Sequence, residues 1–374
     1  MSDRLVLSAP DVRDEDIAAV VEALRSGMLT KGPFTARFEQ AFADYVGAPH
    51  AVAVSSGTAG LHLAVRAAGV DEGAEVITSP FSYIASANAV LYERGTPVFV
   101  DIDEASMTLE PALAAAAVTG RTRAILPVDV FGQPCDLDPL AALCERRGLT
   151  LIEDSCEAIG AEYRGRKVGA AADFTIFSFF PNKQMTTGEG AIVTCRDAAA
   201  AATLRTMRNQ GVAHDASSLH HVGLGYNYRM TEMSAALGVG QIGRIDEMLA
   251  MREQVAGWYR ERLAGVAGAE LIAPAPTTTR LSWFAAIVRL APEFDRDEAI
   301  DRLAALGIPA KGYFAPLHLQ PLYRERFGYK PGDFPVTERV ARSTLALPFH
   351  NRMSEAKVDR VCRALAQMLG GTAG

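Results

Sequence analysis

Lys183 is the residue whose surroundings most clearly suggest chemistry. It follows a run of strand-forming residues and precedes a loop of small residues in the stretch FSFFPNKQMTTGEG, residues 177–190. Most lysines lie in solvent, but a lysine in an apolar pocket or beside another cation loses its proton more easily, and its neutral amine attacks carbonyl groups. The apolar run before Lys183 therefore indicates a candidate nucleophile toward a carbonyl compound.

A candidate anion site lies in SSGTAGLHLA, residues 55–64, where a predicted strand leads directly into a predicted helix. Small residues let an anion approach the free N–H groups and positive dipole end of the helix, so Gly57 and Thr58 are candidate phosphate ligands. An ordinary strand-to-helix turn with a serine cap has the same appearance. The segment lacks the GxGxxG and GxxxxGKS/T patterns, which argues against a dinucleotide site and a P-loop.

Two further segments supply a carboxylate and an aromatic ring. The apolar run in LIEDSCEAIGA, residues 151–161, delivers Glu153 and Asp154 at its end, where open α/β folds bind ligands. An N-cap to a following helix is the alternative interpretation of Asp154. In FSYIASANAV, residues 81–90, Tyr83 opens a predicted helix and could cover a planar cofactor, although core packing is the commoner use of such a ring.

These parts together meet the needs of one cofactor. Pyridoxal phosphate requires an anion site, a wall for its ring, an acid partner for its pyridine nitrogen and a lysine that binds its aldehyde. The sequence supplies all four in order, ending with Ser178 and Lys183 in a serine-x-x-x-x-lysine arrangement. We therefore predict a pyridoxal-phosphate enzyme.

The elements that must position these residues have an α/β pattern. Short β-branched runs alternate with alanine-rich amphipathic stretches over the first two thirds of the chain, and several runs are apolar throughout, as in a sheet covered on both faces. The predicted strands are residues 50–56, 75–80, 96–103, 122–130, 150–155, 174–180 and 191–195. The predicted helices between them are residues 57–69, 82–94 and 137–148.

The pattern changes after a long periodic segment, residues 231–266, which we interpret as one long helix. A turn cluster, a strand and two helices follow, at residues 273–279, 281–290, 296–307 and 354–369. Trp283 and Phe284 are interpreted as core residues of that strand. We predict a large cofactor-binding domain over residues 1–245 and a smaller C-terminal domain over residues 246–374.

Composition narrows the classes of function. The 374 residues are 49% hydrophobic and 22% charged, which is typical of a folded protein of two or three domains. The formal net charge of -7 comes without basic runs, so we expect no nucleic-acid partner. We expect a cytoplasmic protein with no membrane partner, because no apolar stretch is long enough to span a bilayer and the N-terminus lacks a signal peptide. The five scattered cysteines lack CxxC spacing, so we expect neither disulfides nor a metal site.

The motifs resemble the DegT/DnrJ/EryC1/StrS family of sugar aminotransferases, a branch of the fold-type-I pyridoxal-phosphate enzymes, and especially its perosamine-synthase-like subgroup. The resemblance covers nearly the whole chain. It rests on GMLTKGPFTARFEQAFADYVG (27–47), SSGTAGLHLA, SYIASANAV, EDSCEAIGAEYRGRKVG (153–169), FSFFPNKQMTTGEG, GYNYRMTEMSAALG (225–238), and PLHLQPLY through LALPFH (316–350). It implies an α/β fold with a mixed seven-stranded sheet between helices in the large domain, plus a smaller α+β domain.

The resemblance also implies roles for the residues near the cofactor ring. Lys183 matches the lysine that forms an aldimine with pyridoxal phosphate and later moves the substrate proton. Asp154 matches the carboxylate that keeps the pyridine nitrogen protonated. Tyr83 matches the aromatic residue over the ring, and Glu157 matches a position close to the ring and its 3-hydroxyl.

The remaining matches concern phosphate and substrate groups. The family's phosphate site matches Gly57, Thr58 and Ser178. Asn227 matches an asparagine that reaches the cofactor phosphate from the partner subunit, which implies a homodimer with shared active sites. Arg229 matches a position that contacts substrate phosphates, and His318 matches one near the sugar-nucleotide pocket, although a structural histidine is an equal alternative. Ala191 departs from the family pattern, which has a second glycine after GEG.

The implied reaction is a transamination in two halves. An amino donor, expected to be L-glutamate, leaves as 2-oxoglutarate and converts the cofactor to pyridoxamine phosphate. The amino group then passes to a nucleotide-linked keto sugar, expected to be a 4-keto-6-deoxyhexose, and yields an NDP-aminosugar.

Two other functions are compatible with the same motifs. The first is a keto-cyclitol aminotransferase with identical cofactor chemistry, and the second is a non-catalytic regulatory or sensor member of the family. Lys183 argues against the related sugar 3-dehydratases, in which a histidine replaces the lysine. The sequence leaves open the nucleotide, the sugar stereochemistry, C3 or C4 amination, the pathway and any assembly beyond a dimer.

Overall fold

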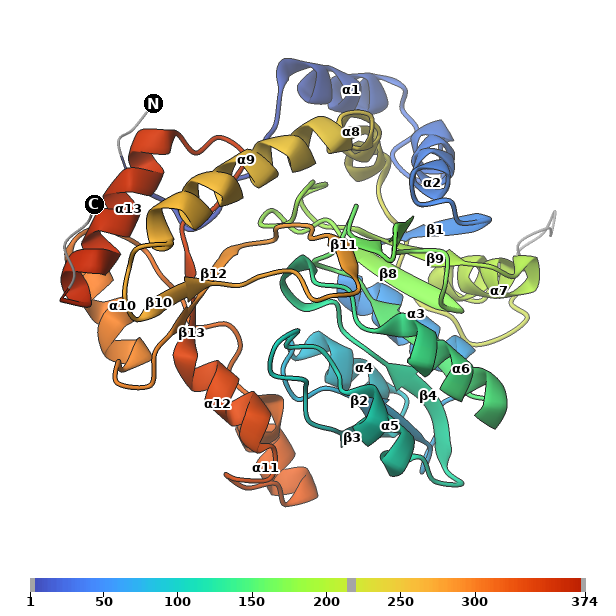
Figure 1. Cartoon of the computed structure of the whole chain (residues 1–374). Coiled ribbons are helices and arrows are strands. Elements are labelled where there is room, and N and C mark those ends of the chain that lie inside the picture. The colour runs from blue at the N-terminus through green and yellow to red at the C-terminus, as the bar shows by residue number, and fades with distance from the viewer. Residues whose placement is uncertain (1–3, 214–219, 371–374) are drawn as a thin grey trace.

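A seven-stranded sheet forms the centre of the computed structural model, which describes residues 4–213 and 220–370 (Figure 1). The strand order is β1-β9-β8-β5-β4-β2-β3, and β9 alone runs antiparallel to its neighbours. The strands are β1 (His50–Val54), β2 (Glu75–Thr78), β3 (Thr96–Phe99), β4 (Thr122–Leu126), β5 (Thr150–Asp154), β8 (Phe174–Ser178) and β9 (Ala191–Cys195). The mixed seven-stranded sheet is confirmed, together with all seven predicted strands.

Helices cover both faces of this sheet. Successive residues of a strand point to opposite faces, so in β8 Ile176 packs into one hydrophobic cluster and Phe177 into another. Residues of α3 and α7 contribute to the first cluster. Residues of α6, of α2 (Pro33–Val46) and of α8 (Glu232–Ile242) contribute to the second. The helices that follow the strands are α3 (Gly57–Ala67), α4 (Ala85–Tyr92), α5 (Pro111–Ala117), α6 (Leu137–Arg147) and α7 (Ala198–Arg208).

The predicted long helix over residues 231–266 is wrong, because the segment forms two helices, α8 (Glu232–Ile242) and α9 (Ile245–Leu263). The break falls at Gly243 and Arg244, after a stretch in which Gly238 and Gly240 already lower the helix propensity. Helix α8 packs against α1 (Asp14–Arg25) and α2 (Pro33–Val46). Figure 1 shows α9 continuing from α8 toward the C-terminal part of the chain.

A second, smaller sheet organises the C-terminal part, which we call the small domain. Its strands β10 (Ala269–Leu271), β12 (Ala286–Leu290) and β13 (Thr344–Leu347) pair antiparallel in the order β10-β12-β13. Its helices are α10 (Arg296–Ala305), α11 (Pro321–Phe327), α12 (Pro335–Ser343) and α13 (Glu355–Met368). The strands β10, β12 and β13 and the helices α10 and α13 contribute to one hydrophobic cluster, which also contains Leu5. The main-chain oxygen of Leu7 accepts a hydrogen bond from Phe349 N–H, so the start of the chain packs against the small domain as well. The division at residues 245 and 246 stays a prediction.

Short elements connect the two parts. Strands β6 (Glu162–Tyr163), β7 (Arg166–Lys167) and β11 (Thr278–Arg280) form a third sheet, and two short 3-10 helices, η1 (Val130–Gly132) and η2 (Leu317–Leu319), lie in connecting segments. Within the described ranges, no helix has the length and apolar character needed to cross a membrane.

Candidate active site

The amine of Lys183 lies in a confined position beyond the end of β8. The strand ends at Ser178, and the Lys183 N–H donates to Phe180 O at 2.9 Å in the turn that follows. Its Nζ lies 3.2 Å from Glu157 Oε1 and 4.4 Å from the centre of the Phe284 ring. The Lys183 side chain is only 12% exposed, so this lysine is not an ordinary solvated surface residue.

Glu157 connects the lysine to the segment that follows β4. Its second carboxylate oxygen, Oε2, accepts from Phe131 N–H at 2.9 Å, and its main-chain oxygen accepts from Gln184 Nε2 at 2.5 Å. Gln184 also donates to Ser282 O at 3.0 Å. Both oxygens of the Glu157 carboxylate therefore accept hydrogen bonds. Gln184, the residue after Lys183, is fixed by hydrogen bonds of its own.

Asp154 is the last residue of β5 and is 5% exposed. Its carboxylate accepts from Ser86 Oγ at 2.8 Å and from Cys156 N–H at 3.2 Å. In the described structure no helix begins after Asp154, because the chain continues through a turn to β6. The alternative interpretation as a helix N-cap is therefore wrong.

The start of α3 combines a serine cap with free amides. Ser56 caps the helix, and its Oγ accepts from Ala59 N–H at 3.1 Å. The N–H groups of Gly57 and Thr58 have no acceptor among the described residues. A Cβ atom added to Gly57 would lie 3.1 Å from Cβ and 3.3 Å from Oγ of Ser178, so the Ser178 hydroxyl lies close to Gly57 at the start of the helix.

The predicted aromatic and partner-facing residues are exposed. Tyr83 precedes α4 in a loop and is 66% exposed, so its ring is not a core residue. Asn227 is exposed between Tyr226 and Tyr228, whose stacked rings turn toward their own chain. The guanidinium of Arg229 donates to Asn209 Oδ1 at 3.0 Å.

His318 does not reach a surface that substrate could contact. The side chain is 0% exposed, and its Nε2 lies 3.1 Å from Glu338 Oε1. Burial lowers the pKa of His318 below its usual value. His318 is therefore a structural histidine, and it is not part of the proposed site.

Two predictions about neighbouring residues need correction. Trp283 and Phe284 are buried, as expected, but they precede β12 rather than lying in it, and the Phe284 ring faces the Lys183 amine. Glu153 is fully buried away from Asp154, where Thr175 Oγ1 donates to it at 2.8 Å. Burial and the nearby Asp129 carboxyl raise the pKa of Glu153 well above its usual value, and burial raises that of Asp129 to about 6.

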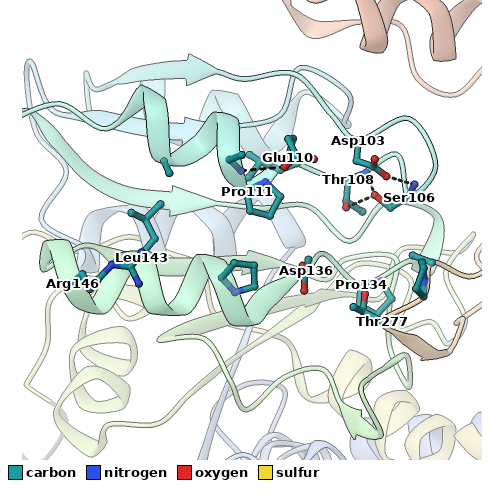
Figure 2. A pocket seen from close by; sticks show the side chains of 16 residues that line it. Asp103, Ser106, Thr108, Glu110, Pro111, Pro134, Asp136, Leu143, Arg146 and Thr277 are labelled. Atoms are coloured by element: carbon teal, nitrogen blue, oxygen red, sulfur yellow. Dashed lines mark hydrogen bonds between the residues drawn. The ribbon is translucent and has the colours of Figure 1, made fainter.

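A separate pocket of about 620 Å³ opens between α5 and α6 (Figure 2). Its lining includes Asp103, Glu110 and Asp136 but none of the candidate site residues. The carboxylates of Asp103 and Glu110 already accept from main-chain N–H groups of their own turns. This pocket is therefore distinct from the surroundings of Lys183.

Comparison with known proteins decides the family. The sequence profile of the DegT/DnrJ/EryC1/StrS aminotransferase family matches residues 10–366 of this chain. The chain belongs to this family. It is 41% identical to GDP-perosamine synthase of Caulobacter vibrioides, over 99% of this chain and 100% of that protein. It is also 37% identical to the spore coat polysaccharide biosynthesis protein SpsC of Bacillus subtilis, over 98% and 97% of the two chains.

Solved structures of the DegT/DnrJ/EryC1/StrS family have the same fold. DesV of S. venezuelae superposes with a TM-score of 0.91 at 36% identity, covering 98% of this chain and 99% of the other. PseC of Helicobacter pylori, an aminotransferase involved in pseudoaminic acid biosynthesis, superposes with a TM-score of 0.93 at 26% identity, covering 98% and 100%. The protein is thus a fold-type-I sugar aminotransferase of the DegT/DnrJ/EryC1/StrS family, and membership supports pyridoxal phosphate as its cofactor.

Proposed function

We propose that the protein uses pyridoxal phosphate to transfer the amino group of L-glutamate to a nucleotide-linked 4-keto-6-deoxyhexose. The observation that carries the proposal is the placement of the Lys183 amine, 3.2 Å from Glu157 Oε1 and largely shielded from solvent. This amine stands at the same edge of the sheet as the Asp154 carboxylate and the free N–H groups of α3, because β5 and β8 are parallel.

The residues at this edge fit pyridoxal phosphate. Gly57 and Thr58 offer unused N–H donors at the start of an 11-residue helix, and the Ser178 hydroxyl adds a third donor for the phosphate. Asp154 supplies an acid partner for the pyridine nitrogen, and Tyr83 supplies an exposed ring to cover the cofactor. When bound, the cofactor supplies an electron sink that makes the substrate α-proton removable.

The protein's own part in the reaction centres on one amine. Lys183 holds the cofactor and then acts as the base that removes and returns a proton at the reacting carbon. Glu157 accepts a hydrogen bond from that amine and restricts where it can move. The Phe284 ring covers the amine on another side and excludes water from it.

We also propose a homodimer whose sites take Asn227 from the partner chain. Tyr226 OH donates to Glu93 Oε1 at 2.9 Å, and Tyr228 OH lies 3.0 Å from His62 Nδ1, so both rings are fixed to their own chain. Because neighbouring residues of an extended segment point in opposite directions, Asn227 is presented outward. In this proposal Asn227 reaches the cofactor phosphate of a second copy, and Arg229 contacts the substrate phosphates.

The similarity to GDP-perosamine synthase supports a nucleotide sugar as acceptor. The decisive experiment incubates the purified protein with glutamate and dTDP-, GDP- and UDP-linked 4-keto-6-deoxyhexoses, and measures 2-oxoglutarate and aminosugar. We expect one nucleotide series to react, Lys183→Ala to be inactive and Lys330→Ala, which changes an exposed lysine, to remain active. Amination of a keto-inositol with no reaction of any nucleotide sugar would overturn the proposed substrate class. A cytoplasmic location stays a prediction.

A further inference from the structure

Arg252 is a charged residue in the interior of the protein. It lies in the middle of α9, is 1% exposed and ranks among the largest fully buried side chains. Burial lowers the pKa of Arg252 to about 10, so the guanidinium remains charged near neutral pH. Over residues 4–213 and 220–370 it forms no ion pair with a carboxylate.

Main-chain carbonyl groups take the place of the missing carboxylate. Arg252 Nη1 donates to Trp283 O at 2.9 Å and to Phe284 O at 3.3 Å, and Nη2 donates to Lys183 O at 3.1 Å. A buried charge is costly unless it is well paired, and bonds to neutral carbonyl groups offset that cost less fully than a carboxylate would. Stability alone therefore gives little reason for a charged group here.

The acceptors identify what the guanidinium holds. Lys183 and Phe284 lie 101 positions apart in the chain, yet the amine of one lies 4.4 Å from the ring centre of the other. Arg252 bonds to the main chain of both residues. Its planar fork therefore sets the distance between two segments: residues 179–190 after β8, which we call the lysine loop, and residues 282–284, which lead into β12.

A second buried side chain holds the neighbouring residues in the same way. Gln184 Nε2 donates to Ser282 O at 3.0 Å and to Glu157 O at 2.5 Å. Two consecutive residues of the lysine loop are thus joined to the segment 282–284, one through Arg252 and one through its own side chain. The second bond also includes Glu157, which contacts the lysine amine.

We propose that Arg252 is a positioning residue that holds the Lys183 amine between Glu157 and Phe284 in the position where it reacts with the cofactor. The guanidinium does not touch the reacting atoms in this proposal. It acts by fixing the main chain of the two residues whose side chains meet. The inference rests on the proposed role of Lys183 as the cofactor-binding lysine.

The test measures the reactivity of Lys183 directly. Cofactor-free protein is mixed with pyridoxal phosphate, the imine is reduced with borohydride at set times, and mass spectrometry follows the modified Lys183 peptide. A 1 Å misplacement can cost about a hundredfold in rate, so we expect Arg252→Met to slow labelling about 10- to 100-fold. With the same variant, kcat per folded molecule falls while the KM for the keto sugar stays within about twofold, and circular dichroism measures the folded fraction so that a general loss of stability is accounted for separately.

Arg296→Met is the matched control. Arg296 Nη1 also donates to main-chain carbonyls, Ala341 O at 2.9 Å and Thr344 O at 3.4 Å, but within the small domain. We expect this variant to lose stability and to label Lys183 at the wild-type rate. Should Arg252→Met fail to fold, Arg252→Lys carries the test, because an ammonium keeps the charge but lacks the planar fork whose two nitrogens bond to Phe284 O and Lys183 O.

The outcomes separate the two proposals. Wild-type protein that is not labelled at Lys183 would overturn the proposed function itself. Labelling of the wild type together with wild-type labelling rates in folded Arg252→Met, or full recovery in Arg252→Lys, would overturn the role of Arg252 alone.

Discussion

Replacing Glu157 with glutamine tests how the Lys183 amine is held. The two carboxylate oxygens of Glu157 serve two donors, the Lys183 amine at 3.2 Å and the Phe131 N–H at 2.9 Å. Glutamine has the same size but offers one acceptor oxygen and one NH₂ group. Whichever way the amide turns, its NH₂ group faces another donor. One of the two bonds must therefore be lost.

The size of the effect follows from burial. The Glu157 and Lys183 side chains are 10% and 12% exposed, so water replaces the lost bond poorly. An unsatisfied buried donor costs about 1–3 kcal/mol, and a bond to a charged group is worth about 1.5–3 kcal/mol. We expect Glu157→Gln to lower the free energy of unfolding by about 1–3 kcal/mol. If a loss of that size also falls on the transition state, kcat decreases roughly 10- to 100-fold.

Denaturant unfolding and steady-state kinetics measure the two effects, with Glu153→Gln as the matched control. Burial and the nearby Asp129 carboxyl raise the pKa of Glu153 well above its usual value, so a neutral side chain of the same size is a mild replacement here. The Thr175 hydroxyl can still donate to the amide oxygen. We expect the control to keep kcat unchanged. Wild-type kcat in Glu157→Gln, or an equal loss in both variants, would refute this account of the amine.

Three further outcomes are expected. Asp154→Asn removes the charge that we propose lies opposite the pyridine nitrogen, so kcat should fall about a hundredfold or more while cofactor absorbance is retained. Normal turnover would exclude Asp154 from the site. Burial raises the pKa of Asp129 from 3.8 to about 6, so its contribution to stability is full below about pH 4 and is lost as the pH rises through 6. The free energy of unfolding of Asp129→Asn should therefore rise relative to that of the wild type between pH 4 and 7, by on the order of 3 kcal/mol. A difference between the two proteins that is the same at every pH would contradict this. Mixing Lys183→Ala with Asn227→Ala subunits should restore about a quarter of wild-type activity, because half of random dimers are mixed and each has one intact site; no recovery after verified subunit exchange would place both residues in one chain.

The sheet could be predicted from the sequence because its signal is local. Runs of β-branched and apolar residues ended by small residues mark each strand, and all seven strands occur where these runs lie. Parallel strands end at one edge, so the proximity of Asp154 to the start of α3 also follows from the pattern. Helical periodicity alone does not predict the break between α8 and α9, although three glycines before Arg244 are a local signal for it.

The contacts around the amine could not be predicted in the same way. Phe284 and Arg252 reach Lys183 from segments 101 and 69 positions away, and their own surroundings in the sequence are those of ordinary core and helix residues. Nothing in the local pattern distinguishes an arginine that bonds to distant carbonyls from one that lies in solvent. The outward direction of Asn227 was accessible, because an alternation of tyrosine, asparagine and tyrosine places the asparagine opposite both rings.

If Lys183 binds the cofactor as proposed, the arrangement around it couples cofactor chemistry to the packing of the two parts of the chain. The lysine belongs to the loop after β8, whereas Phe284 precedes β12 of the small domain and Arg252 lies in the helix that runs between them. If the small domain shifted, the guanidinium could not keep its bonds to both main chains, and the amine would lose the ring that covers it. A ligand that binds only the assembled state stabilises that state. Cofactor bound at Lys183 should therefore stabilise the contact between the two parts, and the same contact keeps the amine in place for proton transfer.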